Sequence, residues 1–243
     1  MDAAEQRLYV VTKEDSALYV LDLKTKRPIS RLPLGAEAYG CLLARDEKTV
    51  YITLWGGDKL LAYDRATGRV RAALATGSHP NELIQRRDGR YLFVANANDN
   101  SVSVVDALTF KVLETISTSL YPTRLTGSTT NGLALSADQK TLYIANADNN
   151  CLAVFDVSRP GHSVAKGFIP TGWYPTCVRV GVVKSWSPTA KACRAWRTRR
   201  GRSRCGRTTT AATNRAACTA RCSTSAVYLR ARSRSSRPPT RPG

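Results

Sequence analysis

Hydrophobic and polar positions recur along the chain in a fixed unit. In one copy, an aromatic and β-branched run over 91–95 is followed by an Asn- and Asp-rich segment over 96–100. Alternating Ser and Val then lead to Asp106. Runs of this kind predict two short strands joined by a polar turn. The unit therefore indicates a β-hairpin.

This hairpin unit occurs four times. In each copy an aromatic residue precedes an aspartate by 13 positions, and successive aromatic residues are 42, 42 and 50 positions apart. The pairs are Tyr9 and Asp22, Tyr51 and Asp64, Phe93 and Asp106, and Tyr143 and Asp156. A spacing of this size, built from strands, is the signature of a β-propeller or a similar array. One aspartate per repeat is explained by turn initiation rather than by catalysis.

The predicted fold class is all-β, a β-propeller of four-stranded blades followed by a disordered basic tail. About four and a quarter blades are present, so we expect the ring to be incomplete. The expected divisions are an N-terminal leader over 1–6, blades at about 7–48, 49–90, 91–140 and 141–183, and a low-complexity tail over 184–243. An open ring exposes apolar blade faces, so we expect self-association through open blade edges.

The formal net charge of +19 belongs mostly to the tail. Residues 1–183 carry 21 Lys and Arg against 18 Asp and Glu, whereas residues 184–243 carry 16 Lys and Arg and no acidic side chain. Beyond Ala, the tail contains only two aliphatic residues, Val227 and Leu229. Such a segment buries too little apolar surface to offset its ordering entropy, so we expect disorder.

Three interpretations of the tail were compared. Its bias towards Arg, Ala, Pro and Thr fits a GC-rich gene translated out of frame after about residue 180. A basic arm for nucleic acid is disfavoured because interleaved aromatic residues are missing. A zinc site at Cys218 and Cys222 is disfavoured because the spacing is poor and no His lies nearby.

Targeting signals and disulfides are not indicated. No apolar stretch is long enough to span a membrane, and the first residues lack a signal-peptide pattern. As written, the chain is expected in the cytoplasm. Seven cysteines, an odd number without an export signal, argue against a disulfide framework.

Two segments carry a resemblance to a known family. Leu92–Asn96 and Leu142–Asn146 resemble the YVTN-type propeller repeat, and the likeness covers residues 7 to about 180. The segments 127–136 and 167–176 are similar to bacterial exported proteins in which such a propeller precedes a phosphoesterase domain of the alkaline-phosphatase superfamily. This resemblance implies a periplasmic or secreted full-length protein whose catalytic residues lie in the second domain. Nothing of that domain is recognisable here, so no catalytic residue is carried over.

Propeller geometry predicts a ligand face. The loop before each inner strand and the turn between the next two strands are expected to line one mouth of the channel. An unknown small molecule or protein is the expected partner there. The candidates are Trp55, His79, Asn81, Glu82, Asn96, Asn98, Arg124, Asn131, Asn146, Asp148, Trp173 and Tyr174. For any single residue, capping of a turn is the simpler role.

The chemistry of these candidates is limited. His79 with Glu82 suggests a base or a ligand, but no second His lies in repeat register, so a structural role is favoured. The chain has no nucleophile elbow, phosphate-binding loop or His-Glu-x-x-His motif. We therefore expect no cofactor and no metal, and the catalytic residues are unknown.

Three functions follow from these observations. The preferred one is a non-catalytic propeller scaffold or binding fragment. The first alternative is a lactonase-type propeller hydrolase that acts through a metal or through acid and base residues at the channel mouth. The second alternative is a nucleic-acid-binding protein, which rests on the tail alone.

Overall fold

The computed structural model describes residues 6–120, 127–181 and 225–230 of the chain. Within these ranges the regular elements are strands apart from one short 3-10 helix, η1 (Trp55–Gly57). The strands of the first half are β1 (Arg7–Thr12), β2 (Ala17–Asp22), β3 (Arg27–Pro33), β4 (Ala38–Leu43), β5 (Thr49–Leu54), β6 (Lys59–Asp64), β7 (Arg69–Ala75) and β8 (Pro80–Gln85). Those of the second half are β9 (Tyr91–Asn96), β10 (Ser101–Asp106), β11 (Lys111–Ser117), β12 (Thr130–Leu135), β13 (Thr141–Asn146), β14 (Cys151–Asp156), β15 (Val164–Pro170), β16 (Pro175–Gly181) and β17 (Ser225–Arg230).

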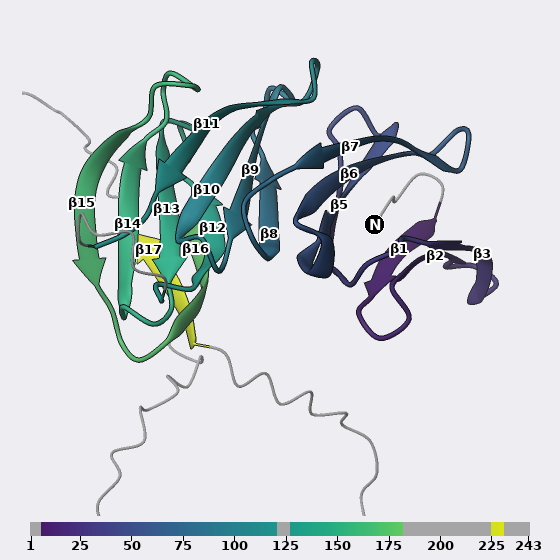
Figure 1. The fold of residues 1–243 in the computed structure, drawn as a ribbon, viewed down its shortest axis with the longest axis horizontal. Coiled ribbons are helices and arrows are strands. Elements are labelled where there is room, and N and C mark those ends of the chain that lie inside the picture. Colours follow the sequence, from purple (N-terminus) through teal and green to yellow (C-terminus); the bar gives the residue numbers. More distant parts are fainter. Residues whose placement is uncertain (1–5, 121–126, 182–224, 231–243) are drawn as a thin grey trace, which may run out of the picture. The chain divides into compact units, whose positions relative to one another are not determined.

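Strands adjacent in sequence pair with one another. Three four-stranded antiparallel sheets are formed by β4–β7, β8–β11 and β12–β15, and β1–β3 form a three-stranded sheet (Figure 1). This arrangement is that of consecutive propeller blades. The predicted all-β propeller fold is thus confirmed.

Each sequence repeat spans parts of two sheets. The repeat at 7–48 contains β1–β4, yet β4 pairs with β5 and begins the next sheet. The same holds for β8 and β12, which pair with β9 and β13. The last strand of one repeat is therefore the inner strand of the following blade.

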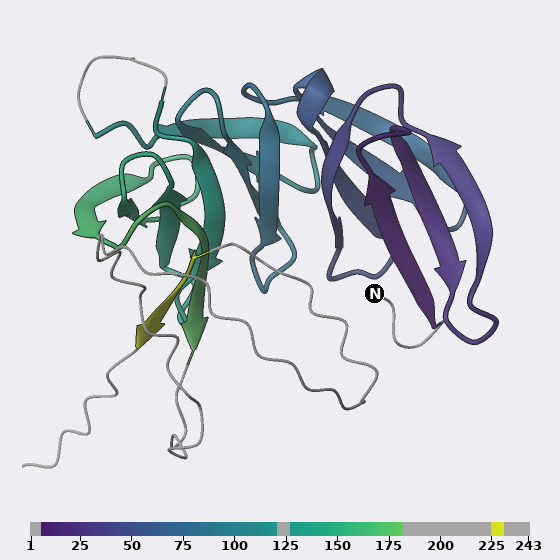
Figure 2. The same ribbon diagram turned by 90° about the horizontal axis from the view of Figure 1, so that it is seen from below.

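The sheets follow one another along the chain (Figure 2). Apolar side chains pack between consecutive sheets. In β5, Val50 and Ile52 pack towards the β1–β3 sheet, whereas Tyr51 belongs to the cluster shared with the β8–β11 sheet. Because successive side chains point to opposite faces of a strand, a strand with a sheet on either side is buried along its whole length. All six residues of β5 and of β10 are buried.

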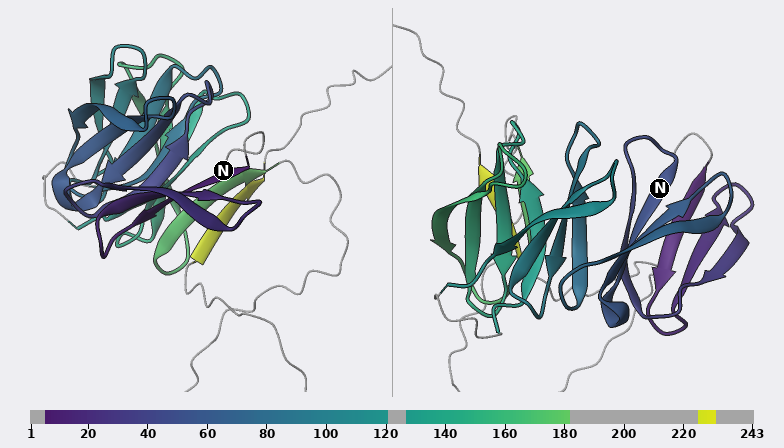
Figure 3. Two further views of the ribbon diagram at one scale, coloured as in Figure 1. Left: turned by 90° about the vertical axis from the view of Figure 1, so that its right-hand side faces the viewer. Right: turned by 45° about the horizontal axis from the view of Figure 1, so that its top comes forward.

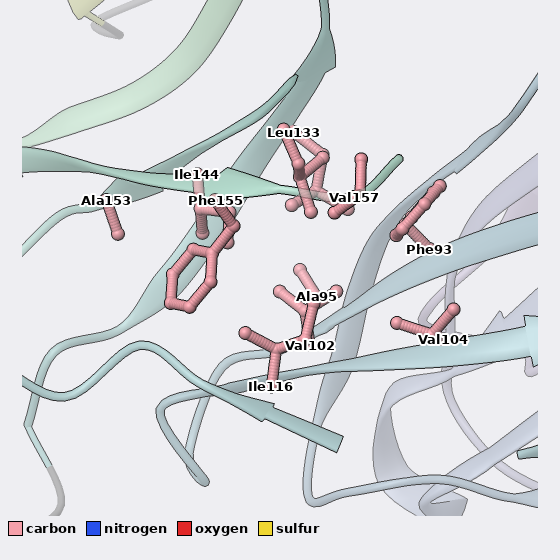
Figure 4. Packing of buried hydrophobic residues seen from close by; sticks show 11 residues of the cluster. Phe93, Ala95, Val102, Val104, Ile116, Leu133, Ile144, Ala153, Phe155 and Val157 are labelled. Carbon is pink, nitrogen blue, oxygen red and sulfur yellow. The ribbon is translucent and has the colours of Figure 1, made fainter. Parts of the chain in front are cut away.

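The largest cluster joins the second and third four-stranded sheets. Phe93 from β9, Ile144 from β13 and Phe155 from β14 lie in it, and the first two are fully buried (Figure 4). A smaller cluster continues the packing from β12–β15 to Val178 of β16. The same face-to-face contact therefore recurs along the array.

The repeated aspartates initiate turns, as the sequence suggested. Oδ1 of Asp22 accepts hydrogen bonds from the backbone N–H groups of Lys24 and Thr25, at 2.7 and 2.9 Å. Asp64 and Asp106 accept the same pair of bonds in their own turns, and Asp156 accepts one of them. These contacts satisfy N–H groups that the strand ladders leave free.

The tail contributes one described element. Strand β17 pairs in parallel with β16 (Figure 3), in a segment that the composition had predicted to be disordered. The rest of the expected tail lies outside the described residues, as does most of the expected leader.

Two further observations bear on the sequence predictions. Among the described residues, no helix is long and apolar enough to cross a membrane. Cys41, Cys151 and Cys177 are free thiols. Burial raises the pKa of the Cys41 and Cys151 thiols, which fits their expected role as small hydrophobic residues.

A glycine-to-alanine pair tests the close approach of two inner strands. A Cβ on Gly132 of β12 would lie 2.8 Å from the carbonyl oxygen of Thr176 in β16, whereas a Cβ on Gly172 would meet nothing within 4 Å. Gly132→Ala should lower the free energy of unfolding by about 1–3 kcal/mol. Gly172→Ala should change it by less than about 0.5 kcal/mol. Urea denaturation of both variants measures the difference, and equal effects would contradict the close packing.

Acid sensitivity tests the turn aspartates. Backbone N–H groups of Thr67 and Ala66 lower the pKa of Asp64 below its ordinary value. A carboxylate with a lowered folded pKa stabilises the protein above its unfolded pKa of about 3.9, and this contribution is lost as the pH falls through the folded pKa. Asp64→Asn should therefore lose less stability than wild type between pH 5 and pH 2. The urea midpoint of each protein is measured across this pH range. Parallel dependences of wild type and variant on pH would show that the Asp64 carboxylate does not contribute to acid sensitivity.

Candidate functional site

The two sets of predicted ligand-face residues lie at the same end of each sheet. The first residue of each inner strand pairs with the last residue of the next strand, as in Ala38 with Leu54, Pro80 with Asn96 and Thr130 with Asn146. The loops that precede the inner strands therefore lie beside the turns that follow β5, β9 and β13. Most of the candidates separate into three groups, and the others are distributed along the loops.

The first group is built into the framework. Asn96 and Asn146 are fully buried. Nδ2 of Asn96 donates to the hydroxyls of Ser101 and Ser103, at 3.0 and 2.9 Å, and Nδ2 of Asn146 donates to the carbonyl of Thr118 at 2.7 Å. These two asparagines therefore join strands and turns through their amide nitrogens, and Oδ1 of each is buried without a hydrogen-bond partner among the described residues.

The second group surrounds His79. Its Nδ1 lies 2.9 Å from Nδ2 of Asn98 and 2.7 Å from Oγ of Ser78. Both contacts converge on the same ring nitrogen, so Asn98 and Ser78 together fix the orientation of the imidazole. Trp55 packs edge to face against this ring, with centroids 4.2 Å apart, and the ammonium of Lys13 lies 4.0 Å from the Trp55 ring. His79 is thus held by these neighbours, and Glu82 is not among them.

The remaining outer candidates are distributed along the loops. Asp148 accepts a hydrogen bond from the hydroxyl of Thr129, and the backbone N–H of Tyr174 donates to Oδ1 of Asn150 at 2.7 Å. The side chain of Trp173 is 82% exposed. Arg124 lies outside the described residues.

The third group lies on the inner strands, where the ladder is irregular. A register shift follows the first residue of β4, β8 and β12. The third residue of these strands is Gly40 in β4, Glu82 in β8 and Gly132 in β12. The β8 strand therefore carries a carboxylate where its neighbours carry only a hydrogen atom.

Glu82 reaches across to two neighbouring inner strands. Its Oε2 accepts a hydrogen bond of 3.0 Å from the backbone N–H of Leu133 in β12. Its Oε1 lies 3.4 Å from Nη1 of Arg179 in β16. β12 is the edge strand of its sheet, so this N–H lies on the edge facing away from β13. A carboxylate can accept it while keeping other lone pairs free.

The environment of Glu82 favours its neutral form. Burial raises the pKa of this carboxyl above its ordinary value, and the N–H of Leu133 and the guanidinium of Arg179 only partly oppose that shift. The Glu82 side chain is 28% exposed and that of Arg179 is 53% exposed. Glu82 is therefore a half-buried acid with access to solvent and a cation beside it.

Two amides extend the polar surface next to Glu82. Nδ2 of Asn81 lies 3.4 Å from Oδ1 of Asn131, across the gap between β8 and β12. Asn81 is 5% exposed, and its Oδ1 is buried without a hydrogen-bond partner among the described residues. A buried acceptor of this kind costs free energy unless a donor reaches it. Thr53 fixes the strand from the other side by donating to the carbonyl of Asn81 at 2.8 Å.

Sequence reasoning missed Arg179. When the inner strands are aligned with one another, Arg179 occupies the position of Leu42, Ile84 and Ala134. One charged residue in a row of apolar residues is a signal that this alignment would have revealed. The irregular ladder and the longer third repeat obscure the register along the chain.

The donor set does not fit a divalent cation. A cluster of three or more His, Cys, Asp and Glu side chains is not found in the described part of the chain. The one carboxylate of the inner-strand group, Glu82, already has a guanidinium as its neighbour. We therefore derive no chemical step through a metal.

The order and pairing of the strands define a β-propeller. Residues 1–169 match the family described as SGL, the SMP-30/Gluconolactonase/LRE-like region. The chain belongs to this family. A comparison with curated proteins gave no match.

Solved structures show the same fold. A protein from Lactobacillus plantarum is 22% identical with a TM-score of 0.62, over 70% of this chain and 56% of that one. The periplasmic gluconolactonase PpgL of Pseudomonas aeruginosa is 21% identical with a TM-score of 0.59, over 72% and 57%. A protein of Bacteroides uniformis, provisionally assigned as a 6-phosphogluconolactonase, is 16% identical with a TM-score of 0.61, over 72% and 57%. The chain spans less than two thirds of the length of these structures.

The raised pKa of Glu82 gives a stability test. An acid whose folded pKa lies above its unfolded value of about 4.3 destabilises the fold at higher pH, and this effect vanishes below the unfolded pKa. Glu82→Gln, which keeps an acceptor for the Leu133 N–H, should therefore raise the melting temperature at pH 7 and leave it nearly unchanged at pH 3.5. Glu14→Gln, at an exposed turn, is the matched control. A lower melting temperature for Glu82→Gln at pH 7 would show that the carboxylate is stabilising instead.

Proposed function

We propose that this chain carries the site of a lactonase-type propeller hydrolase, with Glu82 as the general base. The observation that carries this proposal is the half-buried Glu82 carboxyl, which has a raised pKa and a guanidinium nitrogen 3.4 Å away. A carboxyl whose pKa is moved towards neutrality is suited to proton transfer at physiological pH.

Family membership supports this class of chemistry. The family description includes gluconolactonase, and one structural neighbour is described as a periplasmic gluconolactonase. At the sequence identities observed, the neighbours support only the fold. The family match nevertheless favours the lactonase alternative over the non-catalytic scaffold. The finer resemblance to YVTN repeats fused to a phosphoesterase stays a prediction.

The proposed reaction is the opening of a lactone ring by water. Glu82 accepts a proton from the water as the water oxygen forms a bond to the lactone carbonyl carbon. The guanidinium of Arg179 stabilises the negative charge that develops on the carbonyl oxygen. The bond between the carbonyl carbon and the ring oxygen then breaks, and the proton passes from Glu82 to that oxygen. The product is a hydroxy acid, so all atoms of water and lactone are accounted for.

The two amides fit the polyhydroxylated character of a sugar lactone. Asn131 is only partly buried and lies 3.4 Å from Nδ2 of Asn81, so its amide is placed to meet a hydroxyl group of the substrate. Correct placement of a substrate by such groups contributes to rate by fixing the reacting atoms close together.

Hydrolysis of glucono-1,5-lactone tests the proposal, with proton release followed in weakly buffered solution and the uncatalysed rate subtracted. Glu82→Gln should lower kcat/KM by about 10²–10⁴-fold, the usual contribution of a general base. Glu14→Gln should leave kcat/KM unchanged. The wild-type rate should rise as the pH increases through the pKa of Glu82, because only the carboxylate accepts a proton.

Two results would contradict this assignment. Turnover that is abolished by a chelator but unaffected by Glu82→Gln would place the chemistry elsewhere and require a metal. Saturable binding of the lactone without turnover would return the chain to the binding-scaffold interpretation.

A further inference from the structure

A second polar pocket lies at the opposite ends of the same inner strands. It has a volume of about 640 Å³, within the usual range for small-molecule sites. Its lining comes from both the β4–β7 and the β8–β11 sheets, and Gln85 at the end of β8 is part of it. Gln85 is three residues beyond Glu82, or about 10 Å along an extended strand. The proposed lactonase site does not include any of this lining.

Three arginines from different segments line this pocket. Arg45 follows β4, Arg71 lies on β7 and Arg90 precedes β9. Of these, Arg90 has a carboxylate within reach, with its Nε 3.5 Å from Oδ2 of Asp106. Arg71 makes a side-chain hydrogen bond with the Tyr51 hydroxyl and interacts electrostatically with Asp64. The guanidinium group of Arg45 forms no ion pair among the described residues. A guanidinium has five N–H donors, so Arg71 keeps donors for a ligand beside its contact with Tyr51.

The carboxylates in the lining already have partners. Oδ1 of Asp46 accepts from the backbone N–H groups of Lys48 and Thr49, at 2.9 and 3.3 Å. Asp88 accepts from the N–H of Arg90 at 2.9 Å and forms an ion pair of 3.3 Å with Arg86. These contacts hold the two turns in place, because each carboxylate accepts hydrogen bonds from backbone N–H groups of its own turn. The lining contains three arginines and two aspartates, so its formal charge is +1.

A phenol adds a neutral donor. Tyr51 is 2% exposed and lies in the pocket wall. Burial raises the pKa of its hydroxyl, so the group keeps its proton at physiological pH. Gln85 fixes the floor, because its Oε1 accepts from the N–H of Arg45 at 2.8 Å and its Nε2 donates to the carbonyl of Gly89 at 2.7 Å.

We propose that this pocket binds a phosphate group, held by Arg45, Arg71 and Arg90 with the Tyr51 hydroxyl as a further donor. Guanidinium groups match the planar pairs of oxygens on phosphate and form charge-assisted hydrogen bonds with them. Two sources share this chemistry, inorganic phosphate and a phosphate monoester. The 640 Å³ volume exceeds the needs of a single phosphate ion and leaves room for the organic part of an ester.

The test uses the full chain and a site-resolved readout, because the arginines of the tail also attract anions. ¹⁵N-labelled protein is titrated with inorganic phosphate and, separately, with glucose 6-phosphate. Saturable shifts are expected for the amide signals of Gly89 and Leu108, which belong to the pocket lining. A lower Kd for the ester would identify a phosphate monoester as the ligand class, and equal Kd values would identify the phosphate ion.

Matched arginine variants separate the pocket from general charge attraction. Arg71→Gln should raise the Kd about tenfold or more, because it removes a charged donor. Arg69→Gln removes the same charge from the same strand outside the lining and should leave the Kd unchanged. Equal effects of both variants, or shifts that do not saturate, would overturn the proposal.

Discussion

Face-to-face packing of consecutive sheets is the constraint on which this structure depends. A sheet between two others has no solvent face, so strands such as β5 and β10 are buried on both sides and their apolar residues divide between two clusters. Polar residues then gather at strand ends, turns, the inner edge and the exposed outer strands such as β7 and β11. Both candidate sites lie at such positions.

The inner edge is where the packing is relaxed. Close contact between β12 and β16 requires a glycine at position 132, yet the equivalent position of β8 holds Glu82. Its carboxylate reaches the free N–H of Leu133 and the guanidinium of Arg179. At this position of β8 a carboxylate side chain takes the place of a close backbone contact, and this produces a polar site. The remaining strand pairing of each sheet is preserved.

The sequence was sufficient to predict the strands and the turns, because both depend on local chemistry. The alternation around Phe93 and the aspartates 13 positions later are repeated in every hairpin, and their hydrogen bonds match that interpretation. The site was harder to predict. Asn96 and Asn146 were predicted to face a ligand because they follow strands at the expected channel mouth. Their burial results from contacts with other segments of the chain, which the local sequence does not reveal. Arg179 was missed because its partner lies 97 residues away, across an irregular ladder and a longer repeat.

Pairing between successive strands has a kinetic consequence. Nearly every ladder joins strands separated by one short turn, so the loops that must close during folding are short. Domains dominated by such local contacts fold faster than β-proteins that pair distant segments. Each sheet gains its main partner as soon as the next is synthesised, so structure can grow from the N-terminus during translation. The lone parallel pairing of β16 with β17, across more than 40 intervening residues, is the step expected to form last.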